Sequence, residues 1–150
     1  MASTHDRVAA HVAATRFPFP GQVDWPADYR TVVNVPEPSA AIPGPDGPLY
    51  PDIVILDGSG RVREVGEVET EVDPRRVERW RAGSLAADDR TETGVRHFFL
   101  YVPEGAEAAA RELLDGNAVS YAGLRAYRAA PDGGVAILPV VTPGGPKDHR

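Results

Sequence analysis

Residues 50–72, which read YPDIVILDGSGRVREVGEVETEV, limit the possible folds more than any other part of the chain. The segment contains two stretches rich in Val and Ile, residues 52–56 and 62–70, joined by Asp-Gly-Ser-Gly at 57–60. Short stretches rich in β-branched residues and separated by a glycine-containing turn are typical of a β-hairpin. The sequence therefore predicts two paired strands here, and the rest of the fold has to be built around them.

Three glutamates, Glu67, Glu69 and Glu71, alternate along the second predicted strand. Side chains two residues apart on a strand point to the same face of the sheet, so these carboxylates form a row. Neighbouring carboxylates about 7 Å apart repel each other by about 2 kcal/mol at an effective dielectric constant of about 20. In solvent the row costs little, whereas on a strand covered by protein it needs a cation, which would make it a metal site. Glu71, near Arg75, and Glu64 are expected at the surface.

The remaining pattern predicts helices and strands that alternate along the chain. Asp73 can cap a helix that Pro74 begins and that runs to about residue 87. The other predicted elements are a helix at 4–16, a strand at 29–35, a Pro- and Gly-rich loop at 36–48, a strand at 95–102, a helix at 104–114 and a closing hairpin at 124–129 and 135–141. A hairpin followed by a helix and another strand indicates an α/β fold with a mixed sheet and helices on both faces.

Length and composition are those of one globular domain, with 150 residues of which 42% are hydrophobic and 25% charged. We assign residues 1–141 to this domain and expect the Pro- and Gly-rich residues 142–150 to form a disordered tail. The chain has no cysteine, which excludes disulfides and thiolate metal sites. It has no apolar run of about 20 residues, so we expect a cytoplasmic protein that does not enter a membrane.

The net charge of −6 argues against a dedicated nucleic-acid binder, which usually carries a basic footprint. It leaves room for a nuclease, because acidic catalytic residues and a local arginine patch can coexist with a negative total. Lys147 is the only lysine of the sequence, and it lies in the predicted tail. Cationic roles elsewhere in the chain therefore fall to Arg or His.

Pro51-Asp52 at the start of the hairpin and Glu67-Val68-Glu69 on its second strand resemble the signature of the PD-(D/E)XK nuclease superfamily, the restriction-endonuclease-like fold. The family has Lys where this chain has Glu69, so the chain is similar to a variant with Glu-x-Glu in place of Glu-x-Lys. The family core is a helix, a meander of three strands, a crossover helix and a fourth strand, and it would span residues 4–102. The resemblance implies a restriction-endonuclease-like mixed β-sheet flanked by helices, with a C-terminal helix and hairpin as an extension.

The resemblance also implies roles for the acids. Asp52 and Glu67 would be ligands of Mg²⁺ or Mn²⁺, with the carbonyl of Val68 as a further ligand, and the metal would polarise a phosphate and activate water. Glu69 would act as a general base or as a ligand of a second metal. Phosphate binding would fall to three arginines of the following helix, Arg75, Arg76 and Arg79.

Two functions stay open at this point. The first is a metal-dependent phosphodiester hydrolase acting on nucleic acid, with Asp52, Glu67 and Glu69 as its catalytic residues; cutting both strands of a duplex needs two sites, which suggests a homodimer. The second is a catalytically inactive, oligomeric nuclease-like module for binding or scaffolding, in which the acids are a relic or hold a structural ion. The missing lysine and the net charge favour the second function.

Overall fold

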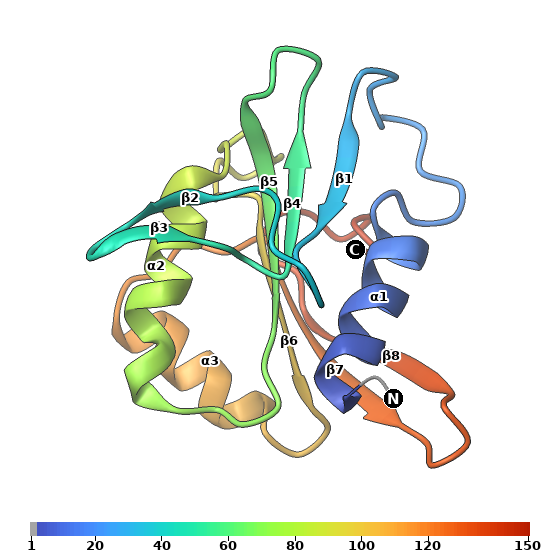
Figure 1. Cartoon of the computed structure of the whole chain (residues 1–150). Coiled ribbons are helices and arrows are strands. Elements are labelled where there is room, and N and C mark those ends of the chain that lie inside the picture. Colours follow the sequence, from blue (N-terminus) through green and yellow to red (C-terminus); the bar gives the residue numbers. More distant parts are fainter. Residues whose placement is uncertain (1–2) are drawn as a thin grey trace.

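The computed structural model describes residues 3–150, which form a six-stranded mixed sheet flanked by three α-helices (Figure 1). The strands of this sheet are β1 (Arg30–Val33), β4 (Ile53–Leu56), β5 (Val62–Val68), β6 (Phe98–Pro103), β7 (Gly123–Ala129) and β8 (Val135–Val141). A small separate sheet consists of β2 (Ile42–Gly44) and β3 (Gly47–Leu49). The helices are α1 (Thr4–Arg16), α2 (Val77–Ala86) and α3 (Glu107–Gly116), and the 3₁₀ turn η1 (Pro74–Arg76) leads into α2.

The strand order across the large sheet is β1-β4-β5-β6-β7-β8. Strands β1, β4 and β5 form an antiparallel meander, β6 and β7 run parallel to β5, and β8 returns antiparallel to β7. The carboxyl ends of the parallel strands β5, β6 and β7 therefore lie at the same edge of the sheet. The predicted mixed sheet with helices on both faces is confirmed.

Two apolar layers hold the helices on the sheet. On one face α1 buries Val8 and Val12 against a cluster that includes Ile53 and Ile55 of β4. On the other face α2 and α3 bury Trp80 and other residues against β5, β6 and β7. Because both faces are covered, β4 and β6 are apolar almost without interruption, as expected for strands buried on both sides.

The predicted loop at 36–48 contains more structure than its composition suggests. Ile42 pairs with Leu49 and Gly44 with Gly47, so β2 and β3 form a short hairpin over α2. Gly47 has a φ of +122°, a conformation that residues with a side chain rarely adopt. Ile42 is buried and anchors the hairpin.

Residues 142–150 also differ from the expected disordered tail, because their last side chain reaches the core. The Arg150 guanidinium pairs with Glu64 of β5, and it lies 2.7 Å from Asp148 and 5.0 Å from the centre of the Phe99 ring. Glu64 is 3% exposed, so its expected surface position is wrong. Its counter-ion comes from a segment far along the chain, and no local pattern marks such a partner.

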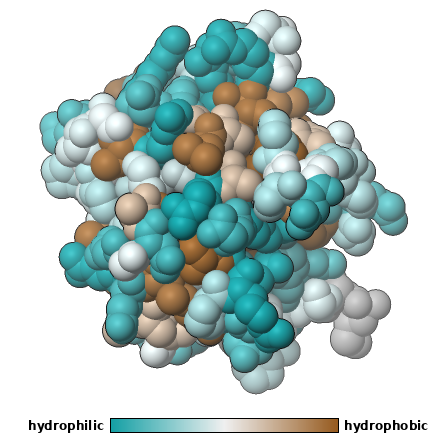
Figure 2. Space-filling view, turned by 90° about the vertical axis from the view of Figure 1, so that its left-hand side faces the viewer, coloured by the Kyte–Doolittle hydropathy of each residue, from teal (hydrophilic) through white to brown (hydrophobic). Residues whose placement is uncertain are grey.

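The side of α2 and the β2–β3 hairpin carries exposed apolar residues. A groove of about 350 Å³ lies there, lined mainly by Pro43, Pro45, Ala82 and Leu85. Leu85 is 64% exposed. Figure 2 views the molecule from this side and shows apolar surface interspersed among polar side chains. Within the described part of the chain no helix has the length and apolar character needed to cross a membrane.

Close contact between α2 and the sheet predicts that Gly83→Ala destabilises the protein. A Cβ at Gly83 would lie 2.9 Å from Cε1 of Phe98 and 3.1 Å from Cγ1 of Val65. Alanine favours a helix by about 1 kcal/mol over glycine, but overpacking of this kind costs about 1–3 kcal/mol, so we expect a net loss of about 1 kcal/mol in urea unfolding. Gly116→Ala in α3 is the control, because nothing lies within 4 Å of its Cβ. Equal effects of the two substitutions would contradict the packing described here.

Candidate functional site

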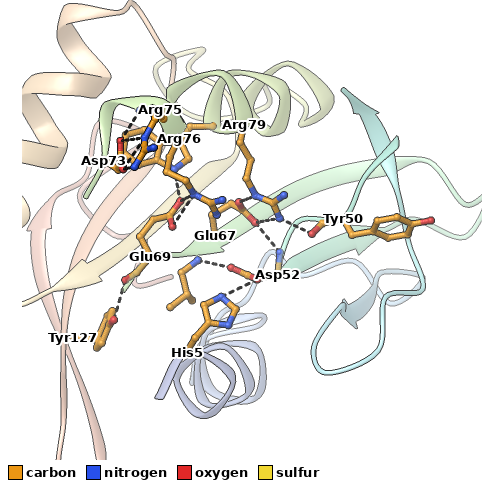
Figure 3. Close-up of polar contacts among 12 residues, drawn as sticks. His5, Tyr50, Asp52, Glu67, Glu69, Asp73, Arg75, Arg76, Arg79 and Tyr127 are labelled. Atoms are coloured by element: carbon orange, nitrogen blue, oxygen red, sulfur yellow. Dashed lines mark hydrogen bonds and ion pairs between the residues drawn. The ribbon is translucent and has the colours of Figure 1, made fainter. Parts of the chain in front are cut away.

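The acids of the sequence signature meet where the carboxyl ends of the parallel strands lie (Figure 3). Asp52 directly precedes β4, and the pairing of Ile53 with Gly66 places Asp52 opposite Glu67 of β5. Glu69 follows the last residue of β5. The structure therefore brings the predicted acids together at the edge where ligands of open α/β sheets often bind.

Asp52 and Glu67 each bond to the backbone of the other's strand. Oε1 of Glu67 accepts a hydrogen bond of 2.7 Å from the Asp52 amide, and Oδ2 of Asp52 accepts one of 2.8 Å from the Val68 amide. Asp52 is 5% exposed and Glu67 1%. The two carboxylates therefore reach past each other and fasten the end of the hairpin, which is a structural role.

Arg79 of α2 lies on the Glu67 carboxylate. Its Nε donates to Oε2 of Glu67, and its Nη2 lies 3.3 Å from Oε1. The same Nη2 donates a 2.6 Å hydrogen bond to the Tyr50 carbonyl. The guanidinium is thus held on both sides, by Glu67 and by the backbone that leads into β4.

His5 of α1 contacts Asp52 from the opposite face of the sheet. Its Nε2 lies 3.1 Å from Oδ1 of Asp52, and its Nδ1 lies 2.9 Å from Asp6. The hydrogen bond with Asp52 raises the pKa of His5 to about 9, against the opposing effect of partial burial, so the imidazole is a cation at neutral pH. Sequence reasoning missed this residue, because it lies 47 positions from Asp52 and only the packing of α1 brings it there.

Glu69 has its own set of partners. Nε of Arg76 lies 3.1 and 2.9 Å from its two oxygens, and Nε1 of Trp80 donates a 2.7 Å hydrogen bond. The Tyr127 hydroxyl donates to the main-chain carbonyl of Glu69. Glu69 is 5% exposed, and its charge is fully engaged by Arg76 and Trp80 of the following helical segment.

Of the three arginines with an expected phosphate-binding role, Arg76 and Arg79 contact the acids and Arg75 does not. The Arg75 side chain is 89% exposed and pairs with Asp73 at 2.7 Å. Glu71, the last member of the predicted row, is exposed, as expected. The row of carboxylates is therefore only partly solvated: Glu67 and Glu69 are covered by η1 and α2, and Glu71 lies outside.

The charge of Glu67 is only partly compensated. Burial, and next the neighbouring Asp52 carboxylate, raise its pKa to about 7, although Arg79 acts in the opposite direction. A carboxylate with this pKa exchanges its proton near neutral pH. The raised pKa reflects two carboxylates that are buried close to each other at the end of the hairpin.

The residues as arranged do not fit Mg²⁺ or Mn²⁺. Such ions require several oxygen ligands that point to one centre, yet each oxygen of Asp52 and of Glu67 already accepts a hydrogen bond or an ion pair. His5 and Arg79 approach the two carboxylates from opposite faces of the sheet. Among residues 3–150 no group of three or more His, Asp or Glu side chains is placed to hold a metal ion.

Comparison of the chain with protein-family models, with curated proteins and with solved structures finds no match in any of the three.

The buried carboxyl group predicts a pH-dependent stability. An acid whose pKa rises from 4.5 in the unfolded chain to about 7 in the folded protein binds its proton more tightly when folded, so the free energy of unfolding falls as the pH rises through this range. We expect the wild type to lose up to about 3 kcal/mol between about pH 5 and pH 7 in urea unfolding. Glu67→Gln should remove this loss, because it removes the titrating group.

The matched control is Glu71→Gln, which changes an exposed glutamate of the same row and should keep the wild-type pH dependence. His5 adds a separate effect, because its pKa is raised from 6.5 to about 9. The protonated His5 therefore stabilises the folded protein below about pH 6.5, and this stabilisation is lost towards pH 9 in all three proteins. An unchanged slope between pH 5 and 7 in Glu67→Gln would contradict a buried Glu67 whose charge Arg79 compensates only in part.

Proposed function

We propose that this chain is a nuclease-like domain that does not cut nucleic acid and instead serves as an oligomeric binding or scaffolding module. One observation carries the proposal: each of the acids in the signature is paired with a cation of the same chain. The pairs are Asp52 with His5, Glu67 with Arg79 and Glu69 with Arg76. A metal-dependent phosphodiesterase needs carboxylates that are free to hold its metal.

The restriction-endonuclease-like fold is part of this proposal. The order of elements, with α1 followed by the meander β1-β4-β5, the crossover helix α2 and the parallel strand β6, agrees with the core that the sequence resemblance implies. Asp52 directly precedes β4, Glu67 lies on β5 and Glu69 directly follows β5, which supports the resemblance. The departures from the family are chemical: Glu69 replaces the usual lysine, and its carboxylate binds Arg76 and Trp80.

The groove over α2 is our candidate for the oligomer contact, with a second copy of the chain as its occupant. Glu78 and Arg81 of opposite charge lie side by side in the groove, 3.3 Å apart. In a two-fold contact the same patch meets itself, so Glu78 of one copy can face Arg81 of the other while the Leu85 side chains pack together. Such an arrangement is self-complementary in both charge and apolar character.

Leu85→Asp should abolish this dimer. We expect the wild type to have the mass of a dimer in light scattering after size exclusion, and the variant to have the mass of a monomer, because a charge in the centre of an apolar contact is costly to bury. Val140→Asp, at another exposed apolar position on β8, is the control and should stay dimeric. A monomeric wild type, or loss of the dimer only in the control, would rule out this contact.

A metal-dependent nuclease that requires Mg²⁺ or Mn²⁺ and acts on nucleic acid is the second candidate. The observation in its favour is the position of Asp52 opposite Glu67, together with the raised pKa of Glu67 caused by burial and by Asp52. In this function the two carboxylates would have to exchange His5 and Arg79 for a metal ion. The fully engaged oxygens described above weigh against it.

A cleavage time course separates the two candidates. Single- and double-stranded DNA and RNA are incubated with wild type or Asp52→Asn in the presence of Mg²⁺, Mn²⁺ or a chelator. We expect no metal-dependent cutting by either protein, with the variant as the control for contaminating nucleases. Cutting by the wild type that needs metal and disappears in Asp52→Asn would overturn the proposal and establish the nuclease.

A further inference from the structure

We propose that residues 142–150, which we name the strap, fill a peptide-binding groove of their own domain, and that this groove takes an arginine-bearing peptide segment of a partner protein. The inference rests on the proposed binding function and deepens it, because it names the class of partner that the module binds. It uses none of the residues Asp52, Glu67 and Glu69, so the two proposals can be tested separately.

Arg150 is the side chain that anchors the strap. The residue is 5% exposed, and its Nη1 donates to Oε1 of Glu64 on β5. Its guanidinium carbon lies 5.0 Å from the centre of the Phe99 ring, and its Nη2 lies 3.5 Å from Nε2 of His97. A buried carboxylate together with an aromatic face favours a planar guanidinium over an ammonium group. The pocket around Arg150 is therefore a guanidinium-binding site.

His97 is oriented to accept a hydrogen bond from this guanidinium. Its Nδ1 contacts the Asp88 carboxylate, and its amide donates a 2.8 Å hydrogen bond to the Asp88 carbonyl. An ionised carboxylate only accepts, so the proton of the imidazole is assigned to Nδ1 and the lone pair to Nε2. Glu64, His97 and Phe99 all come from β5, β6 or the residue before β6. The sheet thus builds the pocket, and the strap supplies its occupant.

Main-chain groups of the strap make further contacts with the domain. The Gly144 amide donates a 3.1 Å hydrogen bond to the Ala122 carbonyl, and Nη2 of Arg125 donates one of 3.0 Å to the Asp148 carbonyl. A Cβ at Gly144 would lie only 2.8 Å from that of Ala122, so the strap approaches the domain closely. Main-chain hydrogen bonds for affinity and one side-chain pocket for specificity are the means by which domains recognise peptide segments.

Asp148 defines the kind of arginine that fits the pocket. Its carboxylate accepts hydrogen bonds of 2.8 and 2.7 Å from Nε and Nη2 of Arg150. This pair lies within the strap and leaves Nη1 of the arginine for Glu64. We therefore expect the partner segment to carry Asp-x-Arg, with the acid two residues before the anchoring arginine.

The strap is held in a way that allows its replacement. Its sequence, TPGGPKDHR, has no large apolar side chain, and Pro146, Lys147 and His149 are exposed. Segments with few buried apolar contacts open locally at low cost in free energy. A cavity of about 580 Å³, lined in part by Phe19, Arg90 and Arg150, adjoins the strap. This cavity leaves room for a partner segment that is longer than the strap.

The test is the binding of a fluorescein-labelled peptide with the sequence of residues 142–150 to the full-length wild type and to Arg150→Ala, followed by fluorescence polarisation. In the variant the strap has lost its anchor, so we expect saturable binding of the peptide. In the wild type the strap competes from within the chain at a high effective concentration, so binding should be at least about tenfold weaker. The matched control is the same peptide with its own Arg150→Ala substitution, which should bind neither protein.

Glu64→Gln/Arg150→Ala provides the control on the side of the pocket. The neutral amide needs no counter-ion, so this protein should stay folded and should not bind the peptide. An Arg150→Ala protein that is unfolded on its own, because Glu64 has lost its cation, should refold when the peptide is added, as monitored by circular dichroism. A ligand that binds only the folded state stabilises it in this way.

The outcomes separate this inference from the proposed function. The groove is ruled out if folded Arg150→Ala fails to bind the peptide, if unfolded Arg150→Ala fails to refold with it, or if the peptide with and without its arginine binds equally. Binding to the wild type as tight as to the variant also rules it out. In each case a dimer that does not cut nucleic acid still supports the proposed function, whereas metal-dependent cutting overturns that function and not the groove.

Discussion

Ion pairs between buried strand carboxylates and cations from other elements govern the architecture of this protein. Strand β5 and the residue after it contribute three carboxylates that are almost completely buried, Glu64, Glu67 and Glu69. A buried carboxylate without a partner costs several kcal/mol, so each one requires a cation nearby. The cations are supplied by the C-terminal segment, by α2 and by η1, in the form of Arg150, Arg79 and Arg76. The apolar layers hold the helices on the sheet, and two of these pairs, Glu67 with Arg79 and Glu69 with Arg76, link α2 and η1 to the end of β5.

The need of buried carboxylates for partners also explains why the oxygens of Asp52 and Glu67 are all bonded within the chain. Asp52 and Glu67 are joined to each other's backbone, and the helices on the two faces of the sheet provide one cation each. A catalytic carboxylate pair would leave oxygens available for a metal or a substrate. Here the arrangement satisfies them within the chain, and the raised pKa of Glu67 is the remaining sign of the like charges brought together by the fold.

Local sequence patterns predicted the helices and strands well, but they did not predict all the ion-pair partners of the buried acids. The hairpin at 50–72 and the start of the following helix are encoded locally, by the Gly-containing turn, by Asp73, which accepts a hydrogen bond from the Arg75 amide, and by Pro74. Because Arg76 and Arg79 follow the acids closely in the sequence, they could be predicted as neighbours of the acids. His5 and Arg150 were beyond this approach, because they lie 47 and 86 positions from Asp52 and Glu64. Their contacts depend on the packing of α1 and on the path of residues 142–150, for which composition predicted disorder.

A crystal structure from crystals grown with MnCl₂, with anomalous diffraction recorded for manganese, tests the central claim most directly. The account predicts no anomalous peak between Asp52 and Glu67, with His5 in contact with Asp52 and Arg79 in contact with Glu67. A manganese peak bound by both carboxylates, with Arg79 turned away from Glu67, would contradict it and would support a metal-dependent function instead.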